Sequence, residues 1–533
     1  MEPGPAHAWT MTGGKGQFEE ALLSSDAAVA PWAEAPPVDF WLFDPASGTL
    51  HHPVGQGVQF SLLEGQVPIP QFRWEVGSTR VTGTLFHDLT DGMVRWRLTV
   101  ENAGETSQDW AAMLAVRPFN IDQGISPILA AGWQGSQRLW LNGAPFMAAA
   151  QPADVFGVAS LPGAPLYEAG QVPTLASIPC DPSGKLLAVA RYDLSLGAGR
   201  AQTLDFAFPS APEANDFPAM NVDVAARLAA TAERWQAEVS RTRITLPDDR
   251  VAGGFPASVG YLLLADDPDG PHPGPLAHDA VWTRDAAYIG LALLQSGHAD
   301  RARAYIPAIL NGQELNGRVP PIQGPNTPWD AEEWDAQGQA IYLVTTTYRY
   351  TGDLELLREW YPAILRAAEF IRALRQSTAE ADDATRGLLP PSLSAEDIGP
   401  ADWHHYWDNF WAIAGLEEAA FAARTLGNAQ DAAWLASEAE DLRAAVLRSI
   451  EQVMGPEPEY IPSAVEHVAD SAMARGTVPA LHPYSVLEVD SELVQRAFAF
   501  YHQRWIAPHA GGFQVTAKRN SGPMEGWNWP MLT

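Results

Sequence analysis

Cysteine is almost absent from this sequence, which has a single one, Cys180, in 533 residues. A disulfide needs two cysteines and a cysteine-bound metal cluster needs several, so the composition excludes both within one chain. Free cysteine is among the residue types most often buried in proteins. We therefore expect Cys180 to be a small apolar residue inside the fold.

Basic residues are also scarce, because 33 Lys and Arg face 64 acidic residues and give a formal net charge of −31. An acidic surface of this kind repels phosphates, so we expect neither nucleic acid nor an anionic membrane as a partner. No apolar run reaches the roughly 20 residues that a membrane helix requires. The first residues lack the basic and apolar regions of a signal peptide, which makes a cytoplasmic location the default expectation.

Alternating apolar and polar residues characterise the first part of the chain. From Met93 to Glu101, the positions of Val94, Trp96, Leu98 and Val100 alternate with polar ones. This period of two is typical of a half-buried strand. Similar short stretches recur between Gly, Pro and Asn residues, at 72–76, 139–141, 187–189 and 204–208. The pattern predicts an antiparallel β-sandwich over roughly residues 40–210, in an N-terminal domain of residues 1–215.

Helical patterns replace the strands in the rest of the chain, where we expect a linker helix within residues 216–250 and a helical domain of residues 251–533. Short Gly/Asp turns alternate there with long loops rich in Pro, Trp and acids. This alternation predicts helical hairpins stacked in a ring, with the long loops and a functional site at one face. A helical solenoid is the alternative, but no repeat of fixed period supports it. The expected helices are 252–265, 284–297, 299–312, 336–351, 353–376, 404–426 and 428–453.

The segment from Trp403 to Leu416 concentrates three tryptophans, a tyrosine, two histidines and one acid, Asp408, before an Ala-rich helical run. Indole faces stack on the C–H faces of sugar rings, and a glycosidic oxygen needs a positioned acid when its bond breaks. Aromatic residues in helices more often belong to the core, so a structural role is the alternative. We interpret the segment as part of a carbohydrate site.

Two other long loops carry candidate ligands. In the first, Arg284 and Asp285 follow Trp282, and a guanidinium beside a carboxylate can hold a pair of sugar hydroxyls. The alternative is that Asp285 caps its helix and Arg284 pairs with it. The second loop, 329–339, places four acids and two tryptophans close together. Their spacing is not that of an EF-hand, so we assign no metal, and no nucleotide or cofactor fingerprint is present.

Trp282-Thr283-Arg284-Asp285 at a helix start, Trp407-Asp408 at a later one, and hairpin helices after a β-sandwich resemble the six-hairpin (α/α)6-barrel glycosidases. This superfamily includes glucoamylases, inverting trehalases and processing α-glucosidases. The resemblance implies an α+β chain in which a β-sandwich precedes an (α/α)6 toroid. It also implies that Arg284 and Asp285 hold the terminal sugar and that Asp408 is the catalytic acid, although glucoamylases carry Glu at that position.

Glu396, in the loop before Asp408, is the rival for the role of acid. Glu525 lies in a later segment that also looks glucoamylase-like, and it would line the sugar site. Trp407 and Trp411 would raise the pKa of Asp408 by excluding water. The remaining sugar-binding candidates are the aromatic platforms and the hydroxyl ligands, namely Trp282, Trp334, Trp403, Trp407, Glu333 and Asp335.

The sequence therefore predicts an exo-acting, inverting glycoside hydrolase, in which one carboxyl protonates the leaving oxygen and a second activates water. A glycoside phosphorylase of the same two-domain plan is the nearest alternative, but it needs a basic phosphate pocket, and few Lys or Arg lie near the long loops. A non-catalytic carbohydrate-binding protein is the second alternative. Neither hydrolysis nor binding of this kind requires a cofactor.

The number of helices carries one more expectation. A ring of six hairpins needs twelve helices, and the pattern after residue 251 supplies about ten. In the resembling glycosidases the catalytic base precedes the final helix. We therefore expect the toroid to be truncated at its C-terminus, with the base beyond Thr533.

Overall fold

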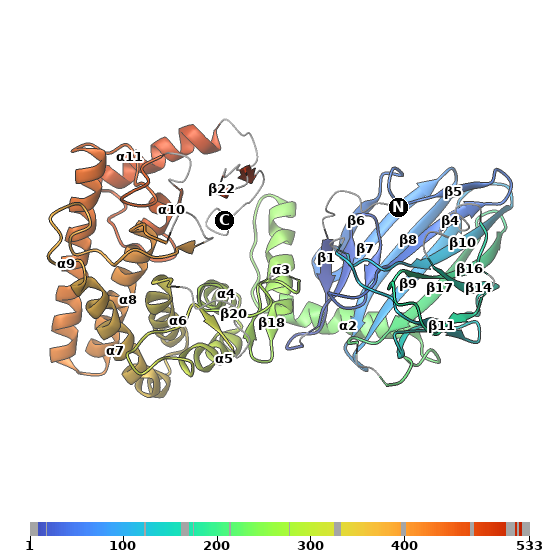
Figure 1. Cartoon of the computed structure of the whole chain (residues 1–533), viewed down its shortest axis with the longest axis horizontal. Helices are drawn as coiled ribbons and strands as arrows, with labels where there is room; N and C mark the ends of the chain where they lie inside the picture. Colours follow the sequence, from blue (N-terminus) through green and yellow to red (C-terminus); the bar gives the residue numbers. More distant parts are fainter. Residues whose placement is uncertain are drawn as a thin grey trace. The chain divides into compact units, whose positions relative to one another are not determined.

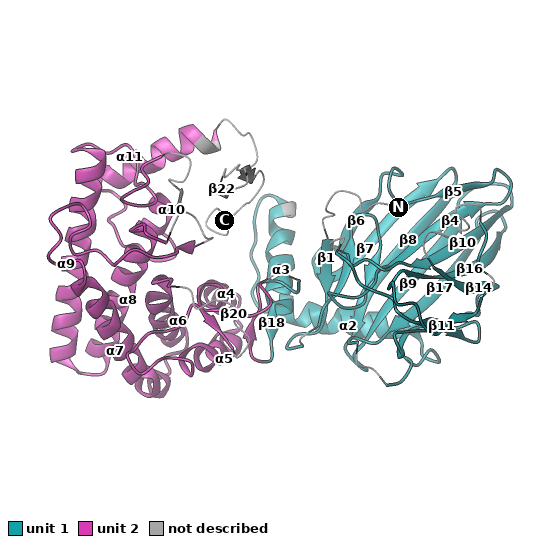
Figure 2. Cartoon of the chain, viewed as in Figure 1, with its two compact units in different colours: residues 1–268, 274–277 teal, residues 269–273, 278–533 magenta. Residues whose placement is uncertain are grey.

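The computed structural model describes residues 9–524 except for 18, 122–123, 161–169, 174, 213–214, 277, 325–331, 396–400, 470–473, 508–516 and 520–521. The chain forms two compact units (Figures 1 and 2). The first comprises residues 1–268 and 274–277, and the second comprises residues 269–273 and 278–533. No described helix has the combination of length and apolar character needed to cross a membrane.

Two antiparallel sheets make up most of the first unit, which confirms the expected N-terminal sheets. One sheet has the order β1-β2-β3-β4-β10-β16-β14, with β5 paired to β4, and the other has the order β15-β11-β12-β13-β17-β9-β8-β7-β6. The strands are β1 Trp9–Thr12, β2 Ala21–Ser24, β3 Val29–Ala30, β4 Val38–Asp44, β5 Thr49–His51, β6 Gln59–Leu63, β7 Val67–Val76, β8 Thr79–Asp88, β9 Met93–Asn102, β10 Gln108–Val116, β11 Ala131–Gln134, β12 Arg138–Leu141, β13 Ala144–Ala149, β14 Val155–Ser160, β15 Ser177–Ile178, β16 Leu186–Leu196 and β17 Ala201–Phe208.

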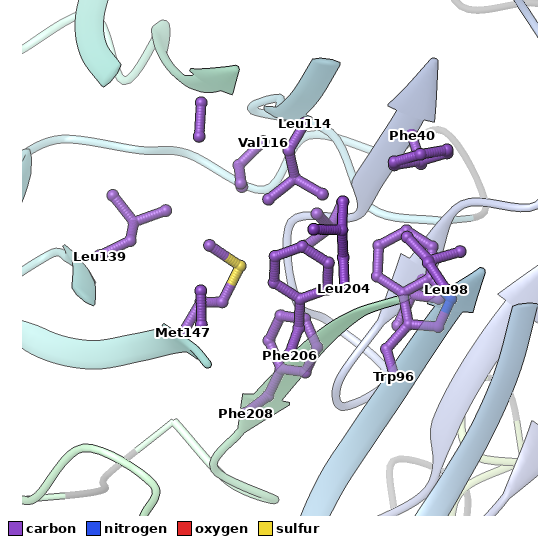
Figure 3. Close-up of a cluster of buried hydrophobic side chains, with 14 of the residues drawn as sticks. Phe40, Trp96, Leu98, Leu114, Val116, Leu139, Met147, Leu204, Phe206 and Phe208 are labelled. Carbon is purple, nitrogen blue, oxygen red and sulfur yellow. The ribbon is translucent and has the colours of Figure 1, made fainter. Parts of the chain in front are cut away.

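A shared hydrophobic core joins the two sheets (Figure 3). Phe40 of β4 belongs to one sheet and Trp96 of β9 to the other, and their rings meet edge to face with centroids 6.3 Å apart. Such a contact adds to the roughly 1.5–3 kcal/mol gained by burying each large apolar side chain. The sheets therefore pack face to face, and the alternation read in residues 93–101 marks the inner face of β9.

Two residues in this unit differ from expectation. Cys180 is exposed, not buried, because it lies in the loop after β15, where Pro179 and Pro182 flank it outside the sheets. Arg95 lies on the polar face of β9 but is fully buried. Its Nε donates to Asp88 at 2.8 Å and its Nη2 to Asp91 at 2.5 Å, so the charge is paired inside the fold.

Helix α2, Val224–Val239, is packed against β7 and β8 of the same unit. Asp223 caps its N-terminus by accepting a hydrogen bond from the Ala226 amide at 3.0 Å. Arg227 approaches Asp88 at 3.7 Å, and Arg234 donates to the Leu89 carbonyl at 2.6 Å. Helix α3, Asp249–Leu264, follows, and both helices belong to the first compact unit.

Six helices dominate the second unit and confirm the expected helical region (Figure 1). Helix α4 contacts α6, and α6 contacts α8, while α5, α7 and α9 pack against these three. Helices α6 and α8 are buried on nearly all sides, whereas α7 and α9 bury one face. The bounds are α4 Thr283–Gln295, α5 Ala299–Leu310, α6 Asp335–Thr351, α7 Leu354–Gln376, α8 Tyr406–Thr425 and α9 Ala429–Met454, each within three residues of the expected ends.

Shorter elements complete this unit. They include β19 Gly270–Pro271, the paired strands β20 Val281–Trp282 and β21 Ile322–Gln323, α10 Ala474–Thr477, α11 Glu492–Tyr501, and the paired strands β22 Ala517–Arg519 and β23 Gly522–Met524. Strand β18, Asp266–Asp267, belongs to the first unit. Pairing of β20 with β21 places Trp282 at the start of α4 next to the loop that leads to α6.

Glycines let α6 and α8 approach each other closely. A Cβ on Gly338 would lie 1.9 Å from the Trp411 carbonyl oxygen, and a Cβ on Gly415 would lie 2.6 Å from the Gly338 Cα. Only glycine fits such a backbone contact. Gly338 is one turn beyond Asp335 and Trp411 is one turn beyond Asp408, so this contact holds the first turns of the two helices side by side.

The Gly338→Ala variant tests this contact. Its methyl group meets backbone, which cannot rotate away, so we expect overpacking to cost about 1–3 kcal/mol and lower the unfolding temperature of the second unit. The matched control is Gly290→Ala in α4, whose methyl would clash with the flexible end of the Leu343 side chain and lie at ordinary contact distance from Tyr305 and Ala302, so it should cost less. Equal melting temperatures for the two variants in differential scanning calorimetry would contradict the close contact.

His87 of β8 is a buried titratable residue in the first unit. It is 1% exposed, and neither ring nitrogen has a hydrogen-bond partner among the described residues. Burial lowers the pKa of His87 to about 4 from its usual 6.5, against the smaller opposing effect of Asp88. The native imidazole therefore stays neutral at pH values where an unfolded chain binds a proton.

This difference predicts acid sensitivity. Because the unfolded state binds more protons between pH 6.5 and 4, the first unit should lose about 3 kcal/mol of unfolding free energy as the pH falls through that window. Over the same pH window, the unfolding free energy of the His87→Leu variant should fall by about 3 kcal/mol less than that of the wild type. The His51→Gln variant should show the same pH dependence as the wild type. Hydrogen exchange of β8 and β9 peptides measures this, and identical pH dependence of wild type and His87→Leu would refute it.

Candidate active site

Asp408 lies in the first turn of α8 and is 1% exposed. Ser392 Oγ donates to its Oδ2 at 2.5 Å, and Ser394 Oγ lies 3.5 Å from its Oδ1. Two hydrogen bonds anchor the loop that carries these serines to Trp403 and to Asn409 of α8. The Ser392 amide donates to the Trp403 carbonyl at 3.1 Å, and the Leu389 amide donates to Asn409 Oδ1 at 2.9 Å. Both oxygens of Asp408 therefore face hydroxyl groups held by backbone contacts.

Asp335, the first residue of α6, is the centre of a buried polar cluster. Its Oδ2 accepts hydrogen bonds from Arg284 Nε at 2.9 Å, Gln339 Nε2 at 2.8 Å and Trp407 Nε1 at 2.8 Å. The other arm of Arg284 pairs with Glu333. Arg284, Glu333 and Asp335 are 8%, 4% and 1% exposed. The cluster thus joins α4, α6 and α8 at their N-terminal turns.

The charges of this cluster act on Asp408. Burial is the largest cause that raises the pKa of Asp408 well above its usual value, and the negative charge of Asp335 is the next. Glu333 acts in the same direction, whereas the Ser392 hydrogen bond and Arg284 act against it. The balance favours the protonated carboxyl, which is the form that a general acid requires.

Several buried polar atoms near these helices have no hydrogen-bond partner within the described part of the chain. They are Trp282 Nε1, Tyr288 OH, Trp334 Nε1, Asp335 Oδ1, Gln339 Oε1 and Trp411 Nε1. The rings of Tyr288 and Trp411 meet edge to face with centroids 5.8 Å apart, and the rings of Trp407 and Trp411 do so with centroids 6.4 Å apart. Buried polar groups are normally satisfied by water or a ligand when protein does not satisfy them. A polyhydroxylated ligand offers both donors and acceptors of this kind.

The structure brings together Arg284, Glu333, Asp335, Trp407 and Asp408 of the residues nominated from sequence. Asp285 is half-buried in the first turn of α4. The other nominated tryptophans lie against different neighbours. The ring centroid of Trp282 lies 5.2 Å from that of His278, and the ring centroid of Trp334 lies 6.1 Å from that of Phe370. Trp403 stacks on His467 with ring centroids 4.8 Å apart. Glu396 and Glu525 lie outside the described residues.

Three residues of the cluster were missed in the sequence. Ser392 and Ser394 are two positions apart, which puts them on one side of an extended segment, and Gln339 is four positions after Asp335, on the same helix face. The second spacing is a readable signal, since a side-chain amide four residues from a carboxylate can donate to it. The serines carried no signal, because their partner is distant in the chain.

Acidic residues also gather around His272, outside this cluster. Its Nδ1 lies 2.7 Å from Asp279 and its Nε2 lies 3.1 Å from Asp269. Both carboxylates are largely exposed. The hydrogen bond between Nδ1 and Asp279 and the ion-pair distance between Nε2 and Asp269 account for this grouping, and we assign no metal to it.

No protein-family model matches the chain, and no curated protein matches its sequence. Among solved structures, a bacterial glucoamylase complexed with acarbose matches with a TM-score of 0.67 and 12% identity, over 95% of this chain and 80% of that one. A protein from the human microbiome described as a kojibiose phosphorylase matches with a TM-score of 0.38 and 10% identity, over 82% of this chain and 63% of that one. A family GH78 rhamnosidase of Bacillus sp. GL1 matches with a TM-score of 0.38 and 12% identity, over 79% of this chain and 38% of that one.

The two weaker matches carry no argument at these TM-scores. The first match concerns the fold, in which N-terminal antiparallel sheets precede a helical region. The chain therefore shares the general plan of a bacterial glucoamylase.

Proposed function

We propose that this chain is a carbohydrate-active enzyme, and specifically an exo-acting, inverting glycoside hydrolase with Asp408 as its general acid. The observation that carries the proposal is the buried carboxyl of Asp408, which its surroundings keep in the protonated form beside Trp407. The shared plan with a glucoamylase, whose structure holds acarbose, supports it. The helices α4 to α9 would then belong to an (α/α)6 toroid.

In this mechanism the Asp408 proton passes to the glycosidic oxygen, which leaves with the bonding electron pair. Water adds to the anomeric carbon from the opposite face and gives its proton to a second carboxylate, about 6.5–9.5 Å from the acid in inverting enzymes. Among the acids of the sequence given, Glu333 and Glu525 are the candidates for this base. Trp282, Arg284, Asp285, Trp334 and Trp403 would hold the sugar, with indole faces and hydroxyl ligands in the roles described above.

Phosphorolysis is the competing reaction, and it needs cations that bind phosphate. Arg284 is the cation of the described cluster, and it is already paired with Glu333 and Asp335. Its positive charge is therefore balanced within the cluster, so it can donate to a neutral hydroxyl but offers no uncompensated charge to a phosphate. The cluster therefore favours water over phosphate as the acceptor.

Glycosides of different sugars and linkages, assayed with and without inorganic phosphate, test the proposed reaction. We expect reducing sugar to be released without phosphate, as the inverted anomer, at an unchanged rate when phosphate is added. Phosphate-dependent release of a sugar phosphate would establish the phosphorylase instead. Tight binding without turnover of any glycoside would indicate a non-catalytic carbohydrate-binding protein.

The Asp408→Asn variant tests the acid. Loss of general acid catalysis should lower kcat at least about a hundredfold while the fold is retained. The matched control is Glu418→Gln, another buried acid of α8 that pairs with Arg349 several turns further along, and it should retain most of the turnover. Near-normal kcat for Asp408→Asn together with an inactive Glu396→Gln would transfer the role to Glu396.

A further inference from the structure

Two neighbours, Asp335 and Ser392, act on the Asp408 carboxyl in opposite directions. Asp335, the first residue of α6, accepts a hydrogen bond at 2.8 Å from Trp407, the residue before Asp408, and its negative charge acts on the Asp408 carboxyl. Three donors on Oδ2, from Arg284, Gln339 and Trp407, orient the Asp335 carboxylate and hold it in place. Because Trp407 precedes Asp408 in α8, its N–H bond to Asp335 also sets the distance between the two helices at this point.

On the side of the preceding loop, Asp408 faces Ser392. The Oγ–Oδ2 distance of 2.5 Å is that of a strong hydrogen bond to a carboxyl group. Asn409, the residue after Asp408, binds the same loop through the Leu389 amide and donates to the His405 carbonyl at 2.8 Å. The loop is therefore fastened to α8 beside Asp408, and Ser392, which is 1% exposed, has a fixed position.

Among the described residues, the charged groups that most affect Asp408 are Asp335, Glu333 and Arg284, contributed by α4, α6 and the residues before α6. Arg284 touches both other members of this set, so its charge is shared between them. A negative charge near a carboxyl opposes its ionisation, whereas a hydroxyl that donates to it stabilises the ionised form.

We propose that Asp335 and Ser392 are positioning residues with opposite effects on the Asp408 carboxyl: Asp335 holds the proton on Asp408 before the reaction, and Ser392 stabilises the carboxylate that remains after the proton has left. This proposal rests on the proposed function, in which Asp408 delivers the proton. A general acid must be protonated at the working pH and must also release its proton in the transition state, and these two neighbours serve the two requirements separately. Asp335 thereby has a role beyond that of a sugar ligand.

The pH dependence of kcat/KM separates the two effects, because activity falls as the pH rises through the pKa of the free enzyme's acid. Asp335→Asn removes a negative charge, so the alkaline limb should move to lower pH. Ser392→Ala removes a donor to the carboxylate, so the limb should move to higher pH. Each shift should be about one pH unit, the size expected for one charge-assisted hydrogen bond or one close charge.

Ser394→Ala is the matched control for the serine. Ser394 lies in the same loop and is similarly buried, but its Oγ is 3.5 Å from Asp408, so its alkaline limb should move less than that of Ser392→Ala. Glu333→Gln is the second variant for the charge, should Asp335→Asn fail to fold. Because Glu333 is also a candidate for the base, this variant is assessed by the protonation of Asp408 itself, whose titration should shift to lower pH as in Asp335→Asn. The proposal is overturned if the alkaline limbs of Asp335→Asn and Ser392→Ala stay in place, or if both limbs move in the same direction.

A direct titration distinguishes failure of this proposal from failure of the proposed function. The Asp408 carboxyl band in infrared difference spectra, identified by its loss in Asp408→Asn, reports protonation without any substrate. Opposite shifts of this titration in Asp335→Asn and Ser392→Ala, with no hydrolysis of any glycoside, would support the positioning roles and refute the hydrolase. Hydrolysis with an unshifted titration in both variants would support the hydrolase and refute the positioning roles.

Discussion

Arg284 carries the positive charge that allows two carboxylates, Glu333 and Asp335, to be buried beside it. Removing one partner of a buried ion pair leaves an unpaired charge in a medium of low dielectric constant, at a cost of several kcal/mol. The ion pairs of Arg284 with Glu333 and Asp335 therefore fix the first turn of α4 against the first turn of α6. Trp407 extends the same network to α8, and through it the position of Asp408 depends on Arg284.

The backbone contact between α6 and α8 complements this network. Gly338 and Gly415 let the two helices touch one turn or more beyond the acids, so the charged residues at the helix starts are brought close by packing and not only by their attraction. Close packing also excludes water, which strengthens each electrostatic interaction in the cluster. The pKa of Asp408 is raised because both conditions hold together, burial first and the charge of Asp335 second.

Buried charge is handled in a similar way in the first unit. Arg95 is enclosed by Asp88 and Asp91, and Asp88 also faces Arg227 of α2, so an ion network joins this helix to the sheets. His87, the residue before Asp88, lacks such partners among the described residues and remains neutral instead. The two neighbours illustrate the two ways in which a fold accommodates a buried ionisable group, by pairing it or by keeping it uncharged.

Local sequence pattern was sufficient for much of this architecture. The period of two in β9 and the helical segments with their Gly and Asp turns predicted the sheets and each long helix, because strand and helix faces are set by residues near one another in the chain. The same pattern gave no warning of β1, β2 and β3: every residue of β2 and β3 is buried, so their sequence does not alternate, and β1 has four residues of which only the last is buried.

Side-chain chemistry was readable in part. Asp335 and Asp408 were identified because each directly follows a Trp at the start of a helix, and Arg284 because it lies two positions after Trp282. Contacts across α4, α6, α8 and a distant loop decide which of these residues pair and which one holds a proton. The same contacts add Ser392 and Gln339 to the cluster. Cys180 and Arg95 show the same limit, since their exposure depends on what covers them. Sequence determines the faces of each element, but burial and ionisation depend on neighbours that only the tertiary structure brings together.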